Sequence, residues 1–164
     1  MTNTNHERIN SLSLLSSVGQ ITIFETSNKI IALEWGQVKT QTRSPVLITA
    51  KTEIIEYLNN ERKEFSIPLH PTGTKFQKSV WAIIAKIPYG QTRTYGEIAN
   101  QLNSAPRPIG GACHANPIPI LIPCHRVIGA NNRLTGFSGG SGVQTKQSLI
   151  KLESQVKNNA HTIN

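Results

Sequence analysis

Two adjacent Cys-His pairs, Cys113-His114 and Cys124-His125, are the residues of this sequence most able to do chemistry. Thiolate and imidazole both bind zinc, so a four-ligand zinc site is the first interpretation to consider. Structural zinc sites usually separate paired ligands by two or more residues, because adjacent side chains point away from each other. The spacing therefore argues against zinc, and no metal site is predicted.

Cys124 is the stronger candidate for a nucleophile. It follows the rigid Pro123, precedes His125 and Arg126, and lies in a strongly basic part of the chain. Nearby cations are expected to lower the pKa of the thiol and so populate the nucleophilic thiolate. Because His125 is adjacent, a bridging water is a more plausible link between imidazole and thiol than a direct hydrogen bond. Cys113 is expected to be a small buried packing residue.

The charge of the chain is unevenly distributed. The formal net charge is +8; residues 1–70 hold seven basic and seven acidic side chains, and residues 71–164 hold ten and two. This excess favours a polyanionic partner for the second half. The chain has no aspartate, and Glu97 and Glu153 are the only acidic side chains after residue 70. That scarcity argues against a two-metal nuclease, a paired-carboxylate hydrolase or a Ser-His-Asp triad there.

The composition is that of a folded protein without a membrane span. With 37% hydrophobic and 16% charged residues, the chain can bury a core. It contains no run of about 18 apolar residues. Residues 1–10 are polar without a basic start, so no secretory signal is expected and a cytoplasmic location is predicted.

The elements that must position these residues form two predicted domains and a tail. In the N-terminal domain, residues 1–70, strands are expected at 21–24 and 30–35, a helix at 51–63 and a short strand at 65–69. Prolines and a glycine at 68–73 indicate a linker. The second domain is placed at residues 71–157, and residues 158–164 are predicted to be a flexible tail.

The second domain is predicted to be mainly helical. Helices are expected at 76–87, at 94–102, at 107–115 and at 144–156, the second beginning with a capping box between Thr94 and Glu97. Two short helices joined by a tight turn make a helix-turn-helix candidate. Three prolines keep residues 116–124 extended, and glycines and asparagines predict a loop over 129–142.

Residues 116–127 (Asn-Pro-Ile-Pro-Ile-Leu-Ile-Pro-Cys-His-Arg-Val) resemble the active-site signature of the O6-alkylguanine-DNA alkyltransferases, also called methylated-DNA–protein-cysteine methyltransferases. The resemblance covers roughly residues 72–153, and extends to the first half only in pattern. It implies an α+β fold, with a small ribonuclease-H-like N-terminal α/β domain and a mainly helical, winged helix-turn-helix-like C-terminal domain. The matching segments are residues 76–81, 88–95, 107–111 and 134–140, with Lys146 and Glu153.

The resemblance implies roles residue by residue. Cys124 matches the alkyl acceptor, His125 the base that reaches it through water, Glu153 the carboxylate that orients the imidazole, and Tyr95 the tyrosine that contacts the flipped guanine and helps neutralise it. Asn116, which orders the helix and active-site loop, and the pocket-lining Val127, Phe137 and Ser138 are implied to be substrate-binding. The implied DNA contacts are Arg107, as a finger inserted into the base stack, with Thr94, Tyr95 and Arg126.

The implied activity is DNA repair by direct damage reversal. The alkyl group of O6-alkylguanine in double-stranded DNA, with O4-alkylthymine a second candidate, moves irreversibly to Cys124 in a single turnover after base flipping. No cofactor is expected, and the protein is predicted to be a monomer. A non-catalytic alkyltransferase-like protein would lack Cys124, and a helix-turn-helix regulator would need neither residues 123–126 nor Tyr95.

The sequence departs from the family pattern at three places. Phe137 replaces the usual tyrosine, which removes a hydroxyl from the pocket wall. The spacing between Tyr95 and Arg107 is two residues shorter than is common, and that between Gly140 and Glu153 is two residues longer. Zinc ligands of some relatives are absent from the first half.

Overall fold

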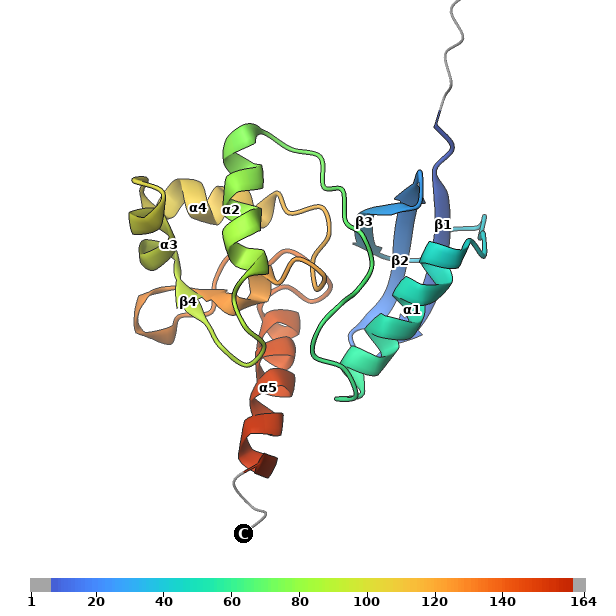
Figure 1. The fold of residues 1–164 in the computed structure, drawn as a ribbon. Helices are drawn as coiled ribbons and strands as arrows, with labels where there is room; N and C mark the ends of the chain where they lie inside the picture. Colours follow the sequence, from blue (N-terminus) through green and yellow to red (C-terminus); the bar gives the residue numbers. More distant parts are fainter. Residues whose placement is uncertain (1–6, 161–164) are drawn as a thin grey trace, which may run out of the picture.

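The computed structural model describes residues 7–160, with side chains described up to residue 155. The N-terminal part holds a small sheet and one helix, and the C-terminal part is mainly helical (Figure 1). The predicted α+β class is confirmed. None of the helices within residues 7–160 is long and apolar enough to cross a membrane.

The N-terminal part is a three-stranded antiparallel sheet with a helix against one face (Figure 1). Its strands are β1 (Asn10–Ser16), β2 (Gly19–Thr26) and β3 (Lys29–Trp35), in the order β1-β2-β3. Helix α1 (Pro45–Leu58) begins where the Ser44 side chain accepts a hydrogen bond from Leu47 N. Alternating leucines and isoleucines of the strands and the inner face of α1 are buried together.

The C-terminal part surrounds a short parallel strand pair. Its helices are α2 (Lys75–Ala85), α3 (Tyr95–Gln101), α4 (Pro106–His114), α5 (Val143–Ala160) and the 3-10 turns η1 (Cys124–Arg126) and η2 (Ala130–Asn132). Strands β4 (Arg93–Thr94) and β5 (Val127–Ile128) pair in parallel. This pair joins the start of α3 to the chain directly after η1, which carries Cys124, so the predicted helix-turn-helix is connected to the candidate site.

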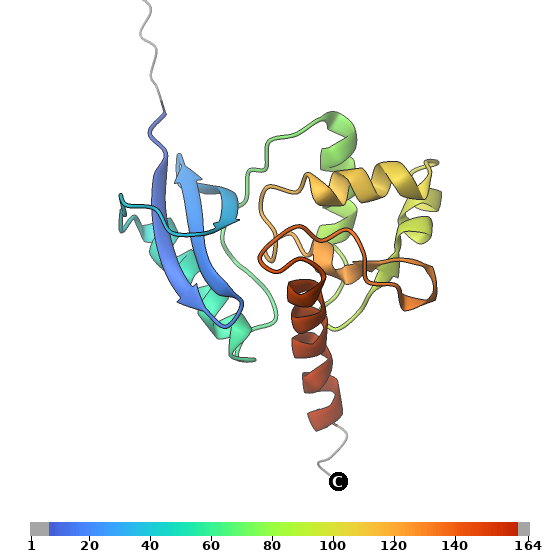
Figure 2. The same cartoon turned by 180° about the vertical axis from the view of Figure 1, so that it is seen from behind.

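The two parts share one continuous hydrophobic core. Leu33 N of β3 donates a hydrogen bond to Pro117 O at 2.9 Å, across the boundary between them. Seen from behind, the loop that precedes α5 extends toward the sheet of the N-terminal part (Figure 2). The domain boundary at residue 70 stays a prediction.

Several predicted elements need correction. Strand β1 is not among the expected elements, and α1 spans residues 45–58 instead of the expected 51–63. The strand predicted at 65–69 is reduced to a single bridge between Ile30 and Leu69. Glu97 does not complete a capping box, because its carboxylate lies 3.6 Å from Arg93 Nε, although its backbone N–H does bond Thr94. Helix α5 continues to Ala160, and the rest of the predicted tail lies outside the described residues.

Candidate active site

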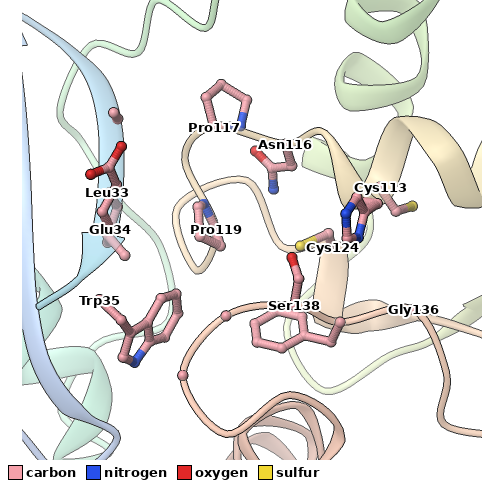
Figure 3. A pocket seen from close by; sticks show the side chains of 15 residues that line it. Leu33, Glu34, Trp35, Cys113, Asn116, Pro117, Pro119, Cys124, Gly136 and Ser138 are labelled. Carbon is pink, nitrogen blue, oxygen red and sulfur yellow. The ribbon is translucent and has the colours of Figure 1, made fainter.

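Cys124 lies at the start of η1, at the end of the extended proline-rich segment. Its side chain is 6% exposed and lines a cavity of about 430 Å³ between the two parts of the molecule. Figure 3 shows the thiol of Cys124 and the hydroxyl of Ser138 pointing into this pocket, with Trp35 on the opposite side. The cavity thus places both apolar and polar side chains in front of a buried sulfur.

Asn116 braces the segment that carries Cys124. Its side-chain amide donates to Ile122 O at 2.9 Å, and its oxygen accepts from Ile118 N at 2.9 Å. Prolines cannot donate backbone hydrogen bonds, so this segment cannot be held by a regular ladder. The asparagine supplies the missing bonds and fixes the approach of the chain to the cavity.

The Cys124 thiol is neutral in the resting structure. Burial raises its pKa, and the opposing effects of the Asn116 side chain and the Lys146 charge do not outweigh it. The expectation that basic surroundings lower this pKa is therefore wrong, because loss of solvation dominates. Thiolate formation requires a base.

His125 is positioned to be that base. It is completely buried, and its Nε2 lies 2.7 Å from Glu153 Oε2. An ionised carboxylate can only accept hydrogen bonds, so Nε2 carries the proton and Nδ1 is the basic nitrogen. Nδ1 has no hydrogen-bond partner among residues 7–155. Burial lowers the pKa of His125, which keeps the imidazole neutral and able to accept a proton.

Glu153 is held by charge and hydrogen bonds from several elements. Arg126 donates to both carboxylate oxygens at 2.8 and 3.0 Å, and Gly90 N donates to Oε1 at 3.2 Å. Burial alone would raise the pKa of Glu153, but His125 and Arg126 outweigh it and lower the pKa to about 2. The carboxylate is therefore ionised at neutral pH, although it is 2% exposed.

The placement of Arg126 contradicts the prediction that it contacts DNA. The residue is 7% exposed, and its side chain donates to Glu153 and to Ile87 O. A guanidinium committed to a buried carboxylate is not available to a phosphate. The position of a residue in a basic segment does not reveal its burial.

Lys146, to which the sequence assigns no role, organises the other side of the site. It is 1% exposed, and its Nζ donates to Val127 O at 2.5 Å, to Thr135 O at 2.7 Å and to the Tyr95 hydroxyl at 3.3 Å. The carbonyl of Val127, predicted to face the substrate, is thus bonded to Lys146. The amphipathic pattern of α5 places Lys146 on the apolar face of the helix. This pattern was the sequence signal that could have indicated a buried lysine with a structural role.

Tyr95 lies beside the Cys124 cavity without lining it. Its hydroxyl donates to Thr135 O at 2.8 Å, and burial raises its pKa to about 12. It borders a second hollow of about 460 Å³ together with Thr94. Gly136 separates the hollows: its φ is +78°, and a Cβ there would come within 2.9 Å of the Tyr95 hydroxyl.

The predicted DNA contacts other than Arg126 lie around this second hollow. Arg107 is exposed at the second residue of α4, directly after Pro106, which borders the hollow. Thr94 caps α3 through a hydrogen bond from Glu97 N. The structure thus separates a buried reactive group from an accessible helical surface that carries an arginine.

The N-terminal part also contributes to the Cys124 cavity, which the sequence did not reveal. Leu33, Glu34 and Trp35 of β3 line it. The Trp35 indole donates to Val18 O at 2.9 Å and meets Phe137 edge-on, with ring centroids 6.2 Å apart. Phe137 is buried, so its missing hydroxyl leaves an apolar wall. Within the described part of the chain, no three His, Cys, Asp or Glu side chains are grouped to hold a metal.

Comparison with known families finds two matches that together span most of the chain. The family description "6-O-methylguanine DNA methyltransferase, ribonuclease-like domain" matches residues 13–71. The description "6-O-methylguanine DNA methyltransferase, DNA binding domain" matches residues 75–155. Both parts of the structure therefore have counterparts in one family.

Individual relatives agree with these matches. A methylated-DNA–protein-cysteine methyltransferase of Methanosarcina acetivorans is 51% identical over 106 residues, covering 63% of this chain and 67% of the relative. The constitutive methyltransferase of that name from Bacillus subtilis is 39% identical over 149 residues, covering 83% of this chain and 90% of the relative. A crystal structure of Mycobacterium tuberculosis OGT in complex with DNA superposes with a TM-score of 0.80 at 37% identity, covering 89% of this chain and 93% of that one.

Proposed function

The chain belongs to the O6-alkylguanine-DNA alkyltransferase family, and we propose that it repairs DNA by direct reversal, moving the alkyl group of O6-alkylguanine onto Cys124. The observation that carries the proposal is a buried cysteine on a cavity, next in the chain to a neutral histidine that a buried glutamate orients. We propose that a methylated-DNA–protein-cysteine methyltransferase activity uses this set of groups without a cofactor.

The proposed reaction begins with proton transfer. The thiol proton of Cys124 passes through a bridging water to His125 Nδ1, and Glu153 stabilises the imidazolium that forms. The thiolate then attacks the alkyl carbon of the substrate in line. The bond between the alkyl carbon and sulfur forms as the bond between the same carbon and O6 breaks. The electron pair of the broken bond stays on the guanine.

The guanine leaves after it has taken up one proton. The Tyr95 hydroxyl is the proposed donor, because it is neutral and hydrogen-bonded beside the cavity. The proton held by His125 is released to solvent, and solvent returns one proton to Tyr95. The net change is transfer of the alkyl group to sulfur and of the thiol proton to guanine, with no oxidant or reductant. A thioether is stable, so each molecule reacts once.

The substrate must leave the DNA stack to reach Cys124. The sulfur is almost fully buried, so an alkyl carbon within a duplex cannot approach it unless the nucleotide rotates out. Residues 71–164 carry ten basic and two acidic side chains, which supports phosphate contacts by this half. We assign to Arg107 the filling of the vacated stack, and we propose that the protein acts as a monomer on double-stranded DNA.

One assay tests the function directly. The protein is incubated with a duplex containing O6-methylguanine, and the added methyl is located by peptide mass spectrometry. The expected result is one methyl per protein, on Cys124. Tight binding of the duplex without transfer would favour a non-catalytic lesion sensor instead, and a methyl on Cys113 would overturn the assignment of Cys124.

A further inference from the structure

The carboxylate oxygen of Glu153 that orients His125 is shared with a residue of the N-terminal part. The Tyr57 hydroxyl donates to Glu153 Oε2 at 2.5 Å, although the two residues are 96 positions apart in the chain. The same oxygen accepts from His125 Nε2 at 2.7 Å and from Arg126 Nη2 at 3.0 Å. Tyr57 and His125 thus both donate to one oxygen, and the Tyr57 hydroxyl oxygen lies 3.4 Å from His125 Nε2.

We propose that Tyr57 is a positioning residue for alkyl transfer: its hydroxyl orients and partly neutralises Glu153 Oε2, which limits how strongly the carboxylate attracts the His125 proton. This inference rests on the proposed function, since it concerns the same proton transfer. It adds a role for the N-terminal part in the chemistry of a cysteine that lies in the C-terminal part.

The placement of Tyr57 is specific. The residue is completely buried on the inner face of α1, and its ring packs against Phe65 and edge-on against Tyr89, with centroids 5.3 and 6.1 Å away. A ring held on both sides cannot swing its hydroxyl away from Glu153. Burial, with the charge and hydrogen bond of Glu153, raises the pKa of Tyr57, so the hydroxyl remains a donor throughout the working pH range.

The electrostatic consequence follows from the number of donors. The carboxylate of Glu153 stabilises an imidazolium in proportion to the negative charge left on Oε2, and each donor reduces that charge. Without the Tyr57 hydroxyl, Oε2 attracts the His125 proton more strongly, and His125 becomes protonated at a higher pH. The charged or ionisable groups facing this pair come from α1, the turn before β4, η1 and α5: Tyr57, Tyr89, Arg126 and Lys146.

The test is the pH profile of Cys124 alkylation in the full chain. Rates with O6-benzylguanine, and separately with iodoacetamide, are measured from pH 5 to 10 in wild type and Tyr57→Phe. The fall in rate at acid pH, the acid limb of the profile, is expected below pH 6.5 in wild type, because burial lowers the pKa of His125 from the ordinary imidazole value of 6.5. In Tyr57→Phe this limb should move up by about one pH unit, while the rate above it stays within about twofold.

A matched control comes from the neighbouring ring. Tyr89 packs on Tyr57, but its hydroxyl makes no hydrogen bond within the described residues. Tyr89→Phe removes a hydroxyl of the same kind from the same cluster and should leave the acid limb in place. Incorporating 3-fluorotyrosine at position 57 keeps the ring shape and makes the hydroxyl a stronger donor, so the limb should move to lower pH. This second variant answers the question even if Tyr57→Phe does not fold.

The outcomes separate this inference from the proposed function. If wild type fails to take an alkyl group on Cys124, the proposed function itself is wrong. If wild type reacts but the Tyr57 variants show unshifted profiles, or the same fractional loss at every pH, Tyr57 has only a packing role and the inference is overturned. A shift of equal size in Tyr89→Phe would also overturn it.

Discussion

The indole of Trp35 lies directly against the backbone of Gly139. A Cβ placed on Gly139 would come within 2.4 Å of Trp35 Cζ3, much closer than real Cβ atoms approach other heavy atoms. Both residues line the Cys124 cavity, and Gly139 belongs to the loop that carries Phe137 and Ser138. The position of this loop is therefore set by strand β3 of the N-terminal part.

Gly139→Ala should displace the loop and slow the reaction. We expect the rate of Cys124 alkylation by O6-benzylguanine to fall about tenfold, because overpacking of this kind costs about 1–3 kcal/mol. In a Trp35→Ala background the same substitution should cost less than about twofold, since the clash is gone. A double-mutant cycle of the four proteins measures the difference.

A control for this cycle is Gly111→Ala on α4. A Cβ at Gly111 would meet nothing within 4 Å, so the rate on the free base should stay within about twofold of wild type. If Gly139→Ala behaved like Gly111→Ala, the loop would not depend on Trp35.

Cys113→Ser should keep its activity, although Cys113 lines the same cavity as Cys124. Burial, and to a lesser extent the nearby Cys124, raises the pKa of Cys113 to about 12, so it stays a neutral thiol. Methyl transfer from an O6-methylguanine duplex should remain within about threefold of wild type. Cys124→Ser should abolish transfer but retain binding of the duplex in a gel-shift assay. An inactive Cys113→Ser beside an active Cys124→Ser would invert the assignment.

Arg107→Ala should impair repair of duplex DNA more than reaction with the free base. Arg107 is exposed on α4, away from the Cys124 cavity, so its proposed work is to offset the cost of flipping the nucleotide. Unstacking costs a few kcal/mol, which sets an expected loss of about tenfold or more on the duplex. Single-turnover rates on both substrates provide the check. Equal losses on both would show that Arg107 acts in folding or chemistry.

Glu153→Gln should destabilise the protein in a pH-dependent way. The folded-state pKa of Glu153 is about 2, below the ordinary glutamate value of 4.5, so its ionisation contributes stability that is present above about pH 4.5 and lost as pH falls toward 2. The contribution is about 3 kcal/mol. Urea unfolding at pH 7, 4, 3 and 2 should show a difference in the free energy of unfolding between wild type and variant, and this difference should shrink as the pH falls. A difference of constant size across this pH range would mean that the carboxylate charge contributes nothing to stability.

Much of the reactive centre could be predicted from the sequence. Cys124 at the end of a proline-rich segment, beside His125 and in a half with few acids, indicated a thiol and a base. The structure places Glu153, one of those few acids, in hydrogen-bond contact with His125. Proline geometry, residue identity and the scarcity of carboxylates are properties that local sequence carries, so these residues could be proposed without the structure, and their roles stay predictions.

Contacts between the two parts could not be predicted in the same way. Tyr57 meets Glu153, and Trp35 meets Gly139, only after the sheet and the helical part have packed together. Helical periodicity shows which face of α1 is apolar, but not which buried hydroxyl finds a carboxylate on another element. The predicted DNA contact of Arg126 disagrees with its buried position for the same reason, because burial depends on tertiary packing. Strand β1 could have been predicted from the sequence, since Leu12 and Leu14 alternate with serines.

A protein that reacts once keeps its capacity only while its thiol is unmodified. Cys124 is 6% exposed and burial raises its pKa, so peroxides and small electrophiles in the surroundings meet a neutral, enclosed sulfur rather than an open thiolate. The cavity that makes ionisation depend on a neighbouring base thereby also protects the group from accidental oxidation. How long an unused molecule stays competent is then decided by the walls around the sulfur, and those walls come from both parts of the chain.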